Sequence, residues 1–410
     1  MEIYDAIVIG AGPAGMICAG RAGERGRKIL LLEKNSQAGK KLLLSGKGRC
    51  NLTNSTDLDR FLAEFSKSGV FLRNAFNQFF NQELVKFFAN LGVGLKTERG
   101  GRIFPVSERA KDILNALKKY LRINRVHLRL NTEVKDIIVK EGLPIEIITN
   151  RGRYRARKVV ISTGGLSYPE TGSDGFGFRM AKKLGHHVIE PRPGLVGLET
   201  QETLPKRLQG LSLENVGVSL ICQKEILAKK FGDMVFTHYG LSGPIILDLS
   251  NLTYDLLEEG KPVYISINLK PALNYEKLDN RLLREFNKSP NKIIKNIFVE
   301  LLPRRAIREF LRYCKINPAI RANQITREMR RRLINGLFDF RFHIIKTRPI
   351  QEAIVTRGGV DTKEINPKTM ESRLIKNLYF GGEVIDVDAK TGGYNLQAAF
   401  STGYVCGDNL

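Results

Sequence analysis

The chain has no tryptophan and few histidines or cysteines, and the scarcity of cysteine is the most informative of these. Only five of its 410 residues are cysteine and five are histidine. No two cysteines form a C-x-x-C pair, so neither a disulfide framework nor a structural zinc site is expected, and a reducing compartment suits the chain best. The histidines never cluster with carboxylates at the spacing of metal ligands, so we expect no bound metal. The five cysteines are Cys18, Cys50, Cys222, Cys314 and Cys406.

Long hydrophobic runs are also missing. No apolar stretch approaches the roughly 20 residues needed to span a bilayer. The opening residues, Met1 to Asp5, contain no basic region before the first apolar run, whereas a secretory signal begins with one. The sequence therefore predicts a cytoplasmic protein without a membrane span, long enough at 410 residues for two or three domains.

Acidic residues are scarce relative to basic ones. The chain has 66 Lys and Arg against 42 Asp and Glu, which gives a formal net charge of +24. This balance excludes an acidic, solvating protein. It makes three kinds of anionic partner worth considering, namely nucleic acid, membrane headgroups and a phosphate-bearing cofactor.

The first 35 residues contain a phosphate-binding pattern. Residues 5–10 form a short apolar run, typical of a strand buried in a parallel sheet. The run leads into Gly10–Gly15, GAGPAG, which fits G-x-G-x-x-G. A helix-compatible stretch over 14–26 and a second apolar strand over 28–32 follow, and that strand ends at Glu33.

Each glycine of the pattern has its own physical role. Gly10 allows the tight turn, Gly12 lets the backbone approach a pyrophosphate, and Gly15 lets the helix pack closely on the strand. The helix N-terminus offers free N–H groups to the phosphates, and Glu33 can accept from both ribose hydroxyls of an adenosine. A plain structural turn is the alternative, but strand, glycines, helix, strand and acid all occur in order. An acid at position 33 disfavours a 2′-phosphate, so FAD or NAD is expected here rather than NADP.

The rest of the chain favours FAD over NAD. A second loop of small and basic residues spans 39–54, and residues 158–165 read as a buried strand that ends in Thr-Gly-Gly. Near the C-terminus, residues 378–395 combine another short strand with glycine-rich loops, and a helix-compatible stretch covers 396–406. No second complete strand–GxGxxG–helix unit occurs. We therefore expect no dedicated pyridine-nucleotide domain, and any NAD(P)H would visit the flavin transiently.

With these motifs, the sequence resembles the BaiN-like flavoproteins, often labelled the aminoacetone oxidase family of FAD-binding enzymes. The matching segments are spread over nearly the whole chain in family order. The chain departs from the family pattern at Asp174, where a second small polar residue is common, and in an unusually basic stretch around 271–340. The matching segments are the opening glycine motif, LLLSGKGRCNLTN (42–54), GGRIFPVSERA (100–110), ISTGGLSYPETGSDGFGFRMAKKLGH (161–186), FTHYGLSGPIILDLS (236–250) and VTRGGVDTKEINPKTMESRLIKNLYFGGEVIDVDAKTGGYNLQAAFSTG (355–403).

The resemblance implies an α/β fold: a glutathione-reductase-like, Rossmann-type FAD-binding domain built from both ends of the chain, with an inserted β-rich plus helical domain. We expect residues 1–190 to form the first part of the FAD-binding domain and residues 341–410 its second part. Between them we expect an inserted β-rich domain over 191–270 and a basic helical sub-bundle over 271–340.

The resemblance also implies which residues bind non-covalent FAD. The glycine motif and Glu33 would hold the ADP half, Val134 would lie near the adenine through its backbone, and Thr163 with Gly164 would cover the ribose side. The helix after Gly393 would point its N-terminus at the flavin N1/O2 edge, where a positive dipole end stabilises reduced flavin. The implied cofactor-binding residues are Gly10, Gly12, Pro13, Ala14, Gly15, Glu33, Lys34, Lys40, Ser45, Gly46, Gly48, Arg49, Cys50, Asn51, Val134, Thr163, Gly164, Gly165, Gly382, Glu383, Asp386, Gly393, Tyr394, Asn395 and Gln397.

The expected helical sub-bundle concentrates positive charge. Between 271 and 340, sixteen Lys and Arg face seven Asp and Glu, a net charge of +9, whereas an even spread of the total would put about +4 there. The sharpest runs are 304–305 and 330–332. The stretch is either a surface for nucleic acid or another anionic partner, or a solvated helix face. We expect the solvated face, because aromatic residues do not interleave with the basic ones as a base-stacking platform requires.

Four residues are candidates for the chemistry. Flavin N5 would carry the hydride, so the protein has to position a substrate and supply a proton. His238 and Tyr239 are the first acid/base candidates, with a purely structural histidine as an equal alternative, and Tyr168 is the second. Arg49 suits a substrate carboxylate or the flavin O4, because its guanidinium carries a fixed fork of donors. Its neighbour Cys50 has no second cysteine nearby in sequence and is expected to be a small buried side chain.

The sequence therefore predicts an FAD-dependent oxidoreductase that moves a hydride between a small organic substrate, or NAD(P)H, and flavin N5. The family it resembles contains members that oxidise small amines with oxygen and members that reduce steroid-like enones with NAD(P)H. The lack of a covalent-flavin motif favours a reductase slightly. Two alternatives stay open, namely an oxygen-using amine oxidase and a flavin-containing nucleic-acid-binding or redox-regulatory protein.

Overall fold

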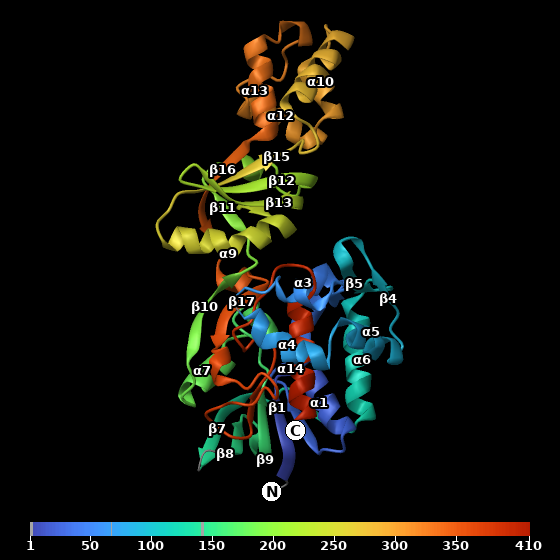
Figure 1. Cartoon of the computed structure of the whole chain (residues 1–410), viewed down its shortest axis with the longest axis vertical. Coiled ribbons are helices and arrows are strands. Elements are labelled where there is room, and N and C mark those ends of the chain that lie inside the picture. Colours follow the sequence, from blue (N-terminus) through green and yellow to red (C-terminus); the bar gives the residue numbers. More distant parts are fainter. Residues whose placement is uncertain (1–2, 67, 141–142) are drawn as a thin grey trace. The chain divides into compact units, whose positions relative to one another are not determined.

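The structure is a computed structural model that describes residues 3–66, 68–140 and 143–410 (Figure 1). It divides into two compact units. We call the first the end unit, because it combines the residues up to Gly194 with Ile350–Leu410 and so contains both ends of the chain. The second, Leu195–Pro349, is the inserted unit.

The end unit is organised around a mixed sheet. Within the described residues, seven strands join in the order β6-β2-β1-β9-β8-β7, with β18 also paired to β9. β6, β2, β1, β9 and β18 run parallel to one another, whereas β8 and β7 are antiparallel additions. The four residues of β2 are all buried, as expected for a parallel strand covered by helices on both faces. The strands are β1 (Ile3–Ile9), β2 (Ile29–Leu32), β6 (His127–Arg129), β7 (Val134–Lys140), β8 (Leu143–Thr149), β9 (Gly152–Ile161) and β18 (Leu378–Phe380).

Two smaller sheets and several helices complete the end unit. The antiparallel pair β10–β17 and the antiparallel sheet β3-β5-β4 lie outside the main sheet. Their strands are β3 (Thr53–Asn54), β4 (Leu95–Thr97), β5 (Arg102–Pro105), β10 (Val188–Gly194) and β17 (Val355–Val360). The helices are α1 (Pro13–Glu24), α2 (Lys40–Leu44), α3 (Leu58–Leu62), α4 (Gly69–Gln78), α5 (Asn81–Asn90), α6 (Ala110–Ile123), α7 (Phe176–Lys183) and α14 (Tyr394–Asp408).

The first and last helices, α1 and α14, lie side by side and pack closely through small residues (Figure 1). A Cβ added to Gly403 would lie 2.3 Å from the carbonyl oxygen of Ala14, and one added to Gly407 would lie 2.5 Å from that of Cys18. Both pairs are four residues apart, so they face each other one helical turn apart. The last helix can therefore approach the first closely enough to complete the end unit only because glycine occupies these positions.

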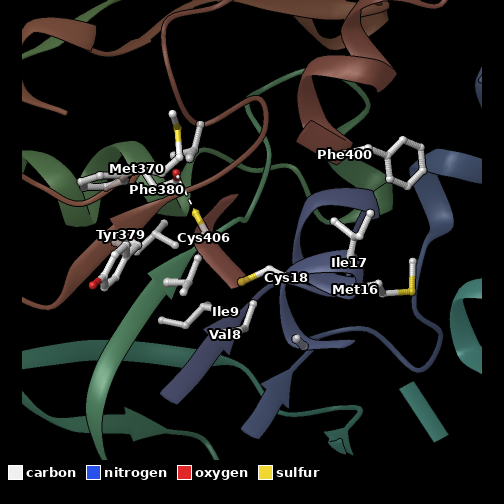
Figure 2. Close-up of a cluster of buried hydrophobic side chains, with 14 of the residues drawn as sticks. Val8, Ile9, Met16, Ile17, Cys18, Met370, Tyr379, Phe380, Phe400 and Cys406 are labelled. Carbon is white, nitrogen blue, oxygen red and sulfur yellow. Dashed lines mark hydrogen bonds between the residues drawn. The ribbon is translucent and has the colours of Figure 1, made fainter. Parts of the chain in front are cut away.

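The core of the end unit draws on both ends of the chain. Figure 2 shows Cys18 of α1 and Cys406 of α14 among buried side chains from β1 and β18. Cys406 donates from its thiol to the carbonyl oxygen of Phe380 at 3.3 Å. All five cysteines of the chain are buried and free. Burial of apolar surface from both ends in one cluster gives the two segments a common driving force for folding.

The inserted unit contains a closed barrel with helices packed on it. Its strands join in the order β11-β14-β13-β12-β15-β16, and β11 also pairs with β16 to close the ring. Helices α10, α12 and α13 gather at one end of the barrel (Figure 1). The strands are β11 (Leu198–Thr200), β12 (Ser212–Cys222), β13 (Glu225–Phe236), β14 (Gly240–Ser242), β15 (Val263–Asn268) and β16 (Phe340–Thr347), and the helices are α8 (Leu204–Arg207), α9 (Pro244–Glu258), α10 (Tyr275–Lys288), α11 (Ile294–Ile297), α12 (Arg304–Tyr313) and α13 (Arg327–Phe338).

The observed architecture confirms the predicted fold class, an α/β Rossmann-type domain made from both chain ends with a β-rich and helical insert. The boundaries between segments differ from those expected. Residues 191–194 belong to the end unit because β10 pairs with β17, and residues 341–349 belong to the inserted unit because β16 closes the barrel. The barrel and the helices over 271–340 share one hydrophobic core, so the two expected inserts form a single unit. Among the described residues, no helix combines the length and apolarity needed to cross a bilayer.

Candidate functional site

Four loops of the end unit meet at the carboxyl edge of the parallel strands. Gly10 follows β1, Glu33 follows β2, Ser162 follows β9 and Gly381 follows β18, and these strands are parallel in adjacent positions. The carboxyl ends of parallel strands lie at one edge of a sheet, and open α/β folds bind their ligands there. The four loops therefore define the candidate site.

The three motif glycines differ in the reason why glycine is required. Gly10 has φ +100°, and a Cβ there would lie 2.6 Å from the carbonyl oxygen of Ser162. A Cβ on Gly15 would lie 1.9 Å from the carbonyl oxygen of Gly10. At Gly12, in contrast, φ is an ordinary −81° and a Cβ would meet nothing within 4 Å. The protein's own packing thus requires glycine at positions 10 and 15, whereas glycine at position 12 leaves open space where a ligand can approach the backbone.

The first turn of α1 lies beside that space. Gly12 is its N-cap and Pro13 its first residue, and no side chain caps the helix. Proline has no N–H group, so the free donors of this turn are the backbone N–H groups of Ala14 and Gly15. An uncapped helix N-terminus combines free donors with a positive dipole end and favours an anionic ligand.

Glu33 holds the glycine loop in place as well as offering an acceptor. Its carboxylate is only 8% exposed. One oxygen accepts from the backbone N–H of Ala11 at 2.9 Å, and the other accepts from the backbone N–H and side-chain amide of Asn35 at 2.9 and 2.8 Å. A carboxylate has about four acceptor positions, so these bonds leave about one for a ribose hydroxyl, fewer than the two that the motif alone suggested.

The neighbouring basic residues are tied to the same loops. Lys34 forms an ion pair with Asp174 at 2.9 Å, and the Lys40 ammonium donates to the side-chain oxygen of Asn35 at 3.2 Å. Val134 is buried as the first residue of β7. The Asp174 that departs from the family pattern therefore compensates the charge of Lys34.

The loop after α2 adopts left-handed backbone conformations at consecutive positions. Gly46, Lys47 and Gly48 have φ values of 56°, 58° and 84°, and the Ser45 hydroxyl donates to the carbonyl oxygen of Leu42 at 2.6 Å. Cys50, which ends the loop, is fully buried, and burial raises the pKa of its thiol to about 12. Cys50 is therefore a protonated side chain at neutral pH, and a thiolate role would oppose its environment.

Arg49 is held by partners within the protein. Its guanidinium pairs with Glu98 and, at 3.1 Å, with Glu108, and it lies 4.2 Å from the ring centroid of Phe104. The bond from Arg49 lowers the pKa of the Glu98 carboxyl, and Lys96 is the main cause of the lowered pKa of Glu108. A role for Arg49 toward a substrate carboxylate would thus require it to exchange these partners.

A charged cluster that the sequence did not indicate surrounds Glu383. Its carboxylate accepts from the Lys41 ammonium at 2.5 Å, from the backbone N–H of Thr356 at 2.7 Å and from the Ser167 hydroxyl at 3.1 Å. Lys41 also donates to Ser167 at 2.6 Å. These residues come from four segments of the chain, and only Glu383 was among the predicted site residues. The position of Lys41 in a small and basic loop beside Lys40 was the available signal.

The loop after β9 packs tightly on this cluster. A Cβ on Gly165 would lie 2.3 Å from the Thr356 hydroxyl oxygen, and one on Gly164 would lie 2.7 Å from that of Ser173. Asp386 follows Glu383 by three residues along the chain. Burial raises the pKa of its carboxyl group, and the charge of Asp388 adds to this effect. The carboxyl group of Asp386 is therefore a weaker acid than usual, and it lies in a site where hydroxyl groups of a ligand could bond to it.

The N-terminus of α14 is the second uncapped helix end at the site. Gly393 is its N-cap, and no side chain caps the helix. The Asn395 amide instead bonds to the backbone N–H and carbonyl of Ala389, at 2.9 and 2.8 Å. With its amide oxygen toward Gly393, Asn51 accepts from that backbone N–H at 3.1 Å and donates to the carbonyl oxygen of Thr53 at 3.2 Å. The N-terminus of α14 therefore has no side-chain cap, and its positive dipole end favours an anionic ligand.

Several buried polar atoms near these loops have no hydrogen-bond partner among the residues that the structure describes. Gln397 donates to Phe79 and Ser401, but its side-chain oxygen is unpaired. Since buried polar atoms are nearly always paired, such a group marks a place where a polar ligand or water binds. The unpaired atoms in this region are Thr53 Oγ1, Thr163 Oγ1, Gln397 Oε1 and Arg49 Nε.

These observations fit an extended, doubly anionic dinucleotide. Two helix N-termini without side-chain caps would offer donors to phosphate and to a flavin edge, the open space at Gly12 would take a pyrophosphate, and Glu33 would offer its remaining acceptor position to a ribose. The aromatic ring of Tyr394 is nine-tenths buried and packs on Phe61 with 4.7 Å between ring centroids. FAD would be held by the residues of these loops.

The acid/base candidates belong to different units. Tyr168 lies in the end unit, directly after Ser167 of the Glu383 cluster, with its backbone in the left-handed region at φ 52°. His238 and Tyr239 lie in the inserted unit, in the turn between β13 and β14. His238 is exposed, and the Tyr239 ring stacks under the Arg348 guanidinium at 4.8 Å. In the described residues, no cluster of three or more potential ligands is placed to hold a metal ion.

Comparison with known proteins supplies the family. The family described as HI0933-like protein Rossmann domain matches residues 4–409. The chain belongs to this family. It is the BaiN-like flavoprotein family that the sequence resembles, so the predicted family is confirmed, and the chain is an FAD-dependent oxidoreductase.

Three curated relatives match over essentially the whole chain. The ribosomal RNA dihydrouridine synthase of Escherichia coli is 34% identical over 412 residues, which cover 100% of this chain and 98% of the relative. The enzyme of the same name from Haemophilus influenzae is 32% identical, with 99% and 98% covered. The 3-dehydro-bile acid delta(4,6)-reductase of Clostridium scindens is 30% identical, with 98% and 97% covered.

Solved structures share the fold of the chain. The 3-ketosteroid delta1-dehydrogenase of Sterolibacterium denitrificans has a TM-score of 0.52 at 14% identity, with 100% of this chain and 99% of that chain covered. The Sdh1 complex of Mycobacterium smegmatis has a TM-score of 0.52 at 16% identity, with 100% and 68% covered. At these identities the likeness concerns the fold alone.

Proposed function

We propose that the chain is a reductase that adds hydrogen across a carbon–carbon double bond conjugated to a carbonyl, and that its substrate is a uridine of ribosomal RNA. The observation that carries this proposal is the full-length similarity to the two enzymes named ribosomal RNA dihydrouridine synthase. Dihydrouridine differs from uridine by two hydrogens on a double bond conjugated to a ring carbonyl. The relative that acts on 3-dehydro-bile acids is named for the reduction of double bonds in a keto compound, which is the same class of bond.

The charge of the chain supports an RNA substrate over a small enone. A net charge of +24 exceeds what binding one pyrophosphate needs, because two helix N-termini and a few side chains already serve that purpose. Neutral, steroid-like substrates gain nothing from excess positive charge, whereas a polyanion does.

Bound FAD would supply the hydride, with NAD(P)H as its transient reductant. The protein then has to exclude water, orient the substrate carbonyl and deliver one proton to the second carbon of the double bond. We propose His238, Tyr239 and Tyr168 as the candidates for that proton. The Lys41–Glu383 ion pair, with Ser167 and Thr356 bonded to the same carboxylate, would fix the loop that leads into Tyr168.

A reoxidation experiment tests the proposal. The holo-protein is reduced under anaerobic conditions with NADPH or NADH, excess nicotinamide is removed, and the return of flavin absorbance is followed after addition of unmodified ribosomal RNA, of a 3-keto-Δ4 steroid, or of oxygen alone. We expect RNA to reoxidise the flavin fastest. Reoxidation by the steroid but not by RNA would contradict the RNA substrate, and reduction by a small amine in place of NAD(P)H would favour the oxidase alternative.

A further inference from the structure

In the basic stretch of the inserted unit, the run with the highest charge density is 330–332. Two of its three arginines bond to other groups of the protein. Arg330 is largely buried and pairs with Asp279 at 2.5 Å. Arg332 is half-buried, and its guanidinium donates to the carbonyl oxygen of Lys315 at 3.4 Å. Arg331 is the one exposed residue of this run. The sequence 330–332 is therefore not a strong candidate for a binding surface.

A different helix presents its arginines to solvent. On α12, Arg304, Arg308 and Arg312 recur every four residues and are exposed, and Arg305 is exposed beside them. Residues four apart lie on one helix face, about 6 Å apart along its axis. We call these four residues the α12 arginine surface. The opposite face of α12 packs into the core of the inserted unit through Ala306, Ile307, Phe310 and Leu311.

The α12 arginine surface has little compensating negative charge. Glu309, the one acidic residue of α12, contacts Arg312 at 2.8 Å and also Arg207 at 3.1 Å, so one carboxylate serves two guanidinium groups. Arg305 donates to the carbonyl oxygen of Gln209 at 2.8 Å. No ion pair involves Arg304 or Arg308 among the described residues. Structure alone therefore does not account for these two arginines.

The two arginines at the start of α12 also oppose the intrinsic electrostatics of the helix. Arg304 and Arg305 are the first two residues of α12, its first turn contains no acid, and Pro303 offers no side-chain cap. Positive charge at a helix N-terminus is unfavourable, because the macrodipole is already positive there. A local preference that is broken without a packing gain is expected at functional positions.

A pocket adjoins the start of this surface. It has a volume of about 350 Å³ and is lined by residues that immediately precede α12, including Pro303, and by Lys270 and Glu214. Lys270 is half-buried, and burial together with the charge of Arg281 lowers the pKa of its ammonium. The recess holds one half-buried amine and one acid, Glu214, beside a row of arginines, so the positive charge in and around it is in excess and favours an anionic group.

We propose that the α12 arginine surface binds the phosphate backbone of the RNA substrate. Guanidinium groups match phosphate in a bidentate geometry, and their regular spacing along one helix suits a chain of phosphates better than a single small anion. This inference rests on the proposed RNA substrate and adds to it the surface that holds the RNA.

The test uses the full-length holo-protein and two matched double variants. R304Q/R308Q removes two exposed arginines at a four-residue spacing from α12. R327Q/R331Q removes two exposed arginines at the same spacing from α13. Binding of deproteinised ribosomal RNA is measured over a range of salt concentrations, and flavin content and thermal melting confirm that both variants fold.

We expect R304Q/R308Q to weaken RNA binding about tenfold at moderate salt. Each lost phosphate contact lowers the slope of log K against log salt by about 0.7, so the slope should fall by about 1.4. R327Q/R331Q should change affinity less than threefold. The rate of flavin reduction by NADPH should be unchanged in both variants, because all four substituted residues belong to the inserted unit and the proposed FAD site to the end unit.

The outcomes separate this inference from the proposed function. Equal weakening of RNA binding by the two variants would overturn the role of the α12 arginine surface. Binding would then depend on the net charge of the protein and not on which helix carries the arginines. Unchanged RNA binding by R304Q/R308Q would overturn it as well, while dihydrouridine formation by the unmodified protein, measured on the same RNA, would still uphold the RNA substrate. Failure of the unmodified protein to bind RNA, or binding to vesicles of phosphatidylglycerol in its place, would overturn both.

Discussion

Alanine substitution at two motif glycines should separate the role of the cofactor from that of the fold. At Gly15, the added Cβ would lie 1.9 Å from the carbonyl oxygen of Gly10 and 2.6 Å from the Ser162 hydroxyl oxygen, so the backbone has to move by more than an ångström. At Gly12, the added Cβ would meet nothing within 4 Å, and φ is already −81°. One substitution therefore disturbs the protein, and the other intrudes only on the space proposed for the ligand.

The magnitudes follow from these contacts. Overpacking against backbone should cost Gly15→Ala about 3 kcal/mol or more, which lowers the Tm of a unit of this size by about 6–12 °C. Gly12→Ala should stay within about 0.5 kcal/mol of the unsubstituted protein when FAD has been removed. Its FAD affinity should nevertheless fall about tenfold to a hundredfold, because one charge-assisted hydrogen bond to the pyrophosphate is lost.

The assay is thermal melting of the flavin-free proteins together with titration of each with FAD. A stable Gly12→Ala variant that binds FAD normally would refute the assignment of the open space to the pyrophosphate. A Gly15→Ala variant that melts normally would refute the packing argument for the β1–α1 turn.

Three further predictions concern single side chains. Glu33→Gln should lower FAD retention about tenfold, because it weakens both the ribose acceptor and the bond that holds Ala11; unchanged flavin content on purification would contradict this. His238→Ala and Tyr168→Phe should each lower turnover at least tenfold while flavin content stays unchanged, and a variant with full turnover would remove its residue from the proton-transfer step. Burial lowers the pKa of His186 below 6.5, so the unfolded chain takes up a proton before the folded one, and stability should fall as pH drops below about 6.5, by at most about 1.4 kcal/mol per pH unit. Denaturation across pH should show that His186→Gln reduces this slope, and an unchanged slope would contradict this prediction.

The part of the site that sequence could predict is the part that is local along the chain. The order of strand, glycines, helix, strand and Glu33 lies within 33 residues, and its physical requirements are met by single residue types at fixed spacing. The structure accordingly shows a steric need for glycine at Gly10 and Gly15 and open space at Gly12. The individual roles of these residues toward FAD stay predictions.

The contacts that sequence could not predict join distant segments. The Glu383 carboxylate bonds to Lys41, Ser167 and Thr356, which are 342, 216 and 27 residues away along the chain. No local pattern indicates such a cluster, because each partner is a common residue type and the three lie in separate places, Lys41 in α2, Ser167 in a loop and Thr356 in β17. The boundary of the inserted unit was missed for the same reason, since β16 belongs to the barrel through its pairing with β11 and β15.

Charge was the feature for which sequence was least specific. Counting residues identified the basic stretch over 271–340 and named both 304–305 and 330–332 as its sharpest runs, without distinguishing between them. Only the fold reveals that Arg330 is paired with Asp279, while Arg304 and Arg308 are exposed. A run of like charges in sequence does not become a surface unless the helix that carries it turns those side chains to solvent.

Nucleoside mass spectrometry of ribosomal RNA tests the central claim most directly. Unmodified ribosomal RNA is incubated anaerobically with the holo-protein and NADPH or NADH, digested to nucleosides and compared with a reaction that contains heat-inactivated protein. The proposed function predicts dihydrouridine, a uridine that has gained two hydrogens, in the active reaction alone. Oxidation of the nicotinamide without any dihydrouridine above the inactivated control would contradict it.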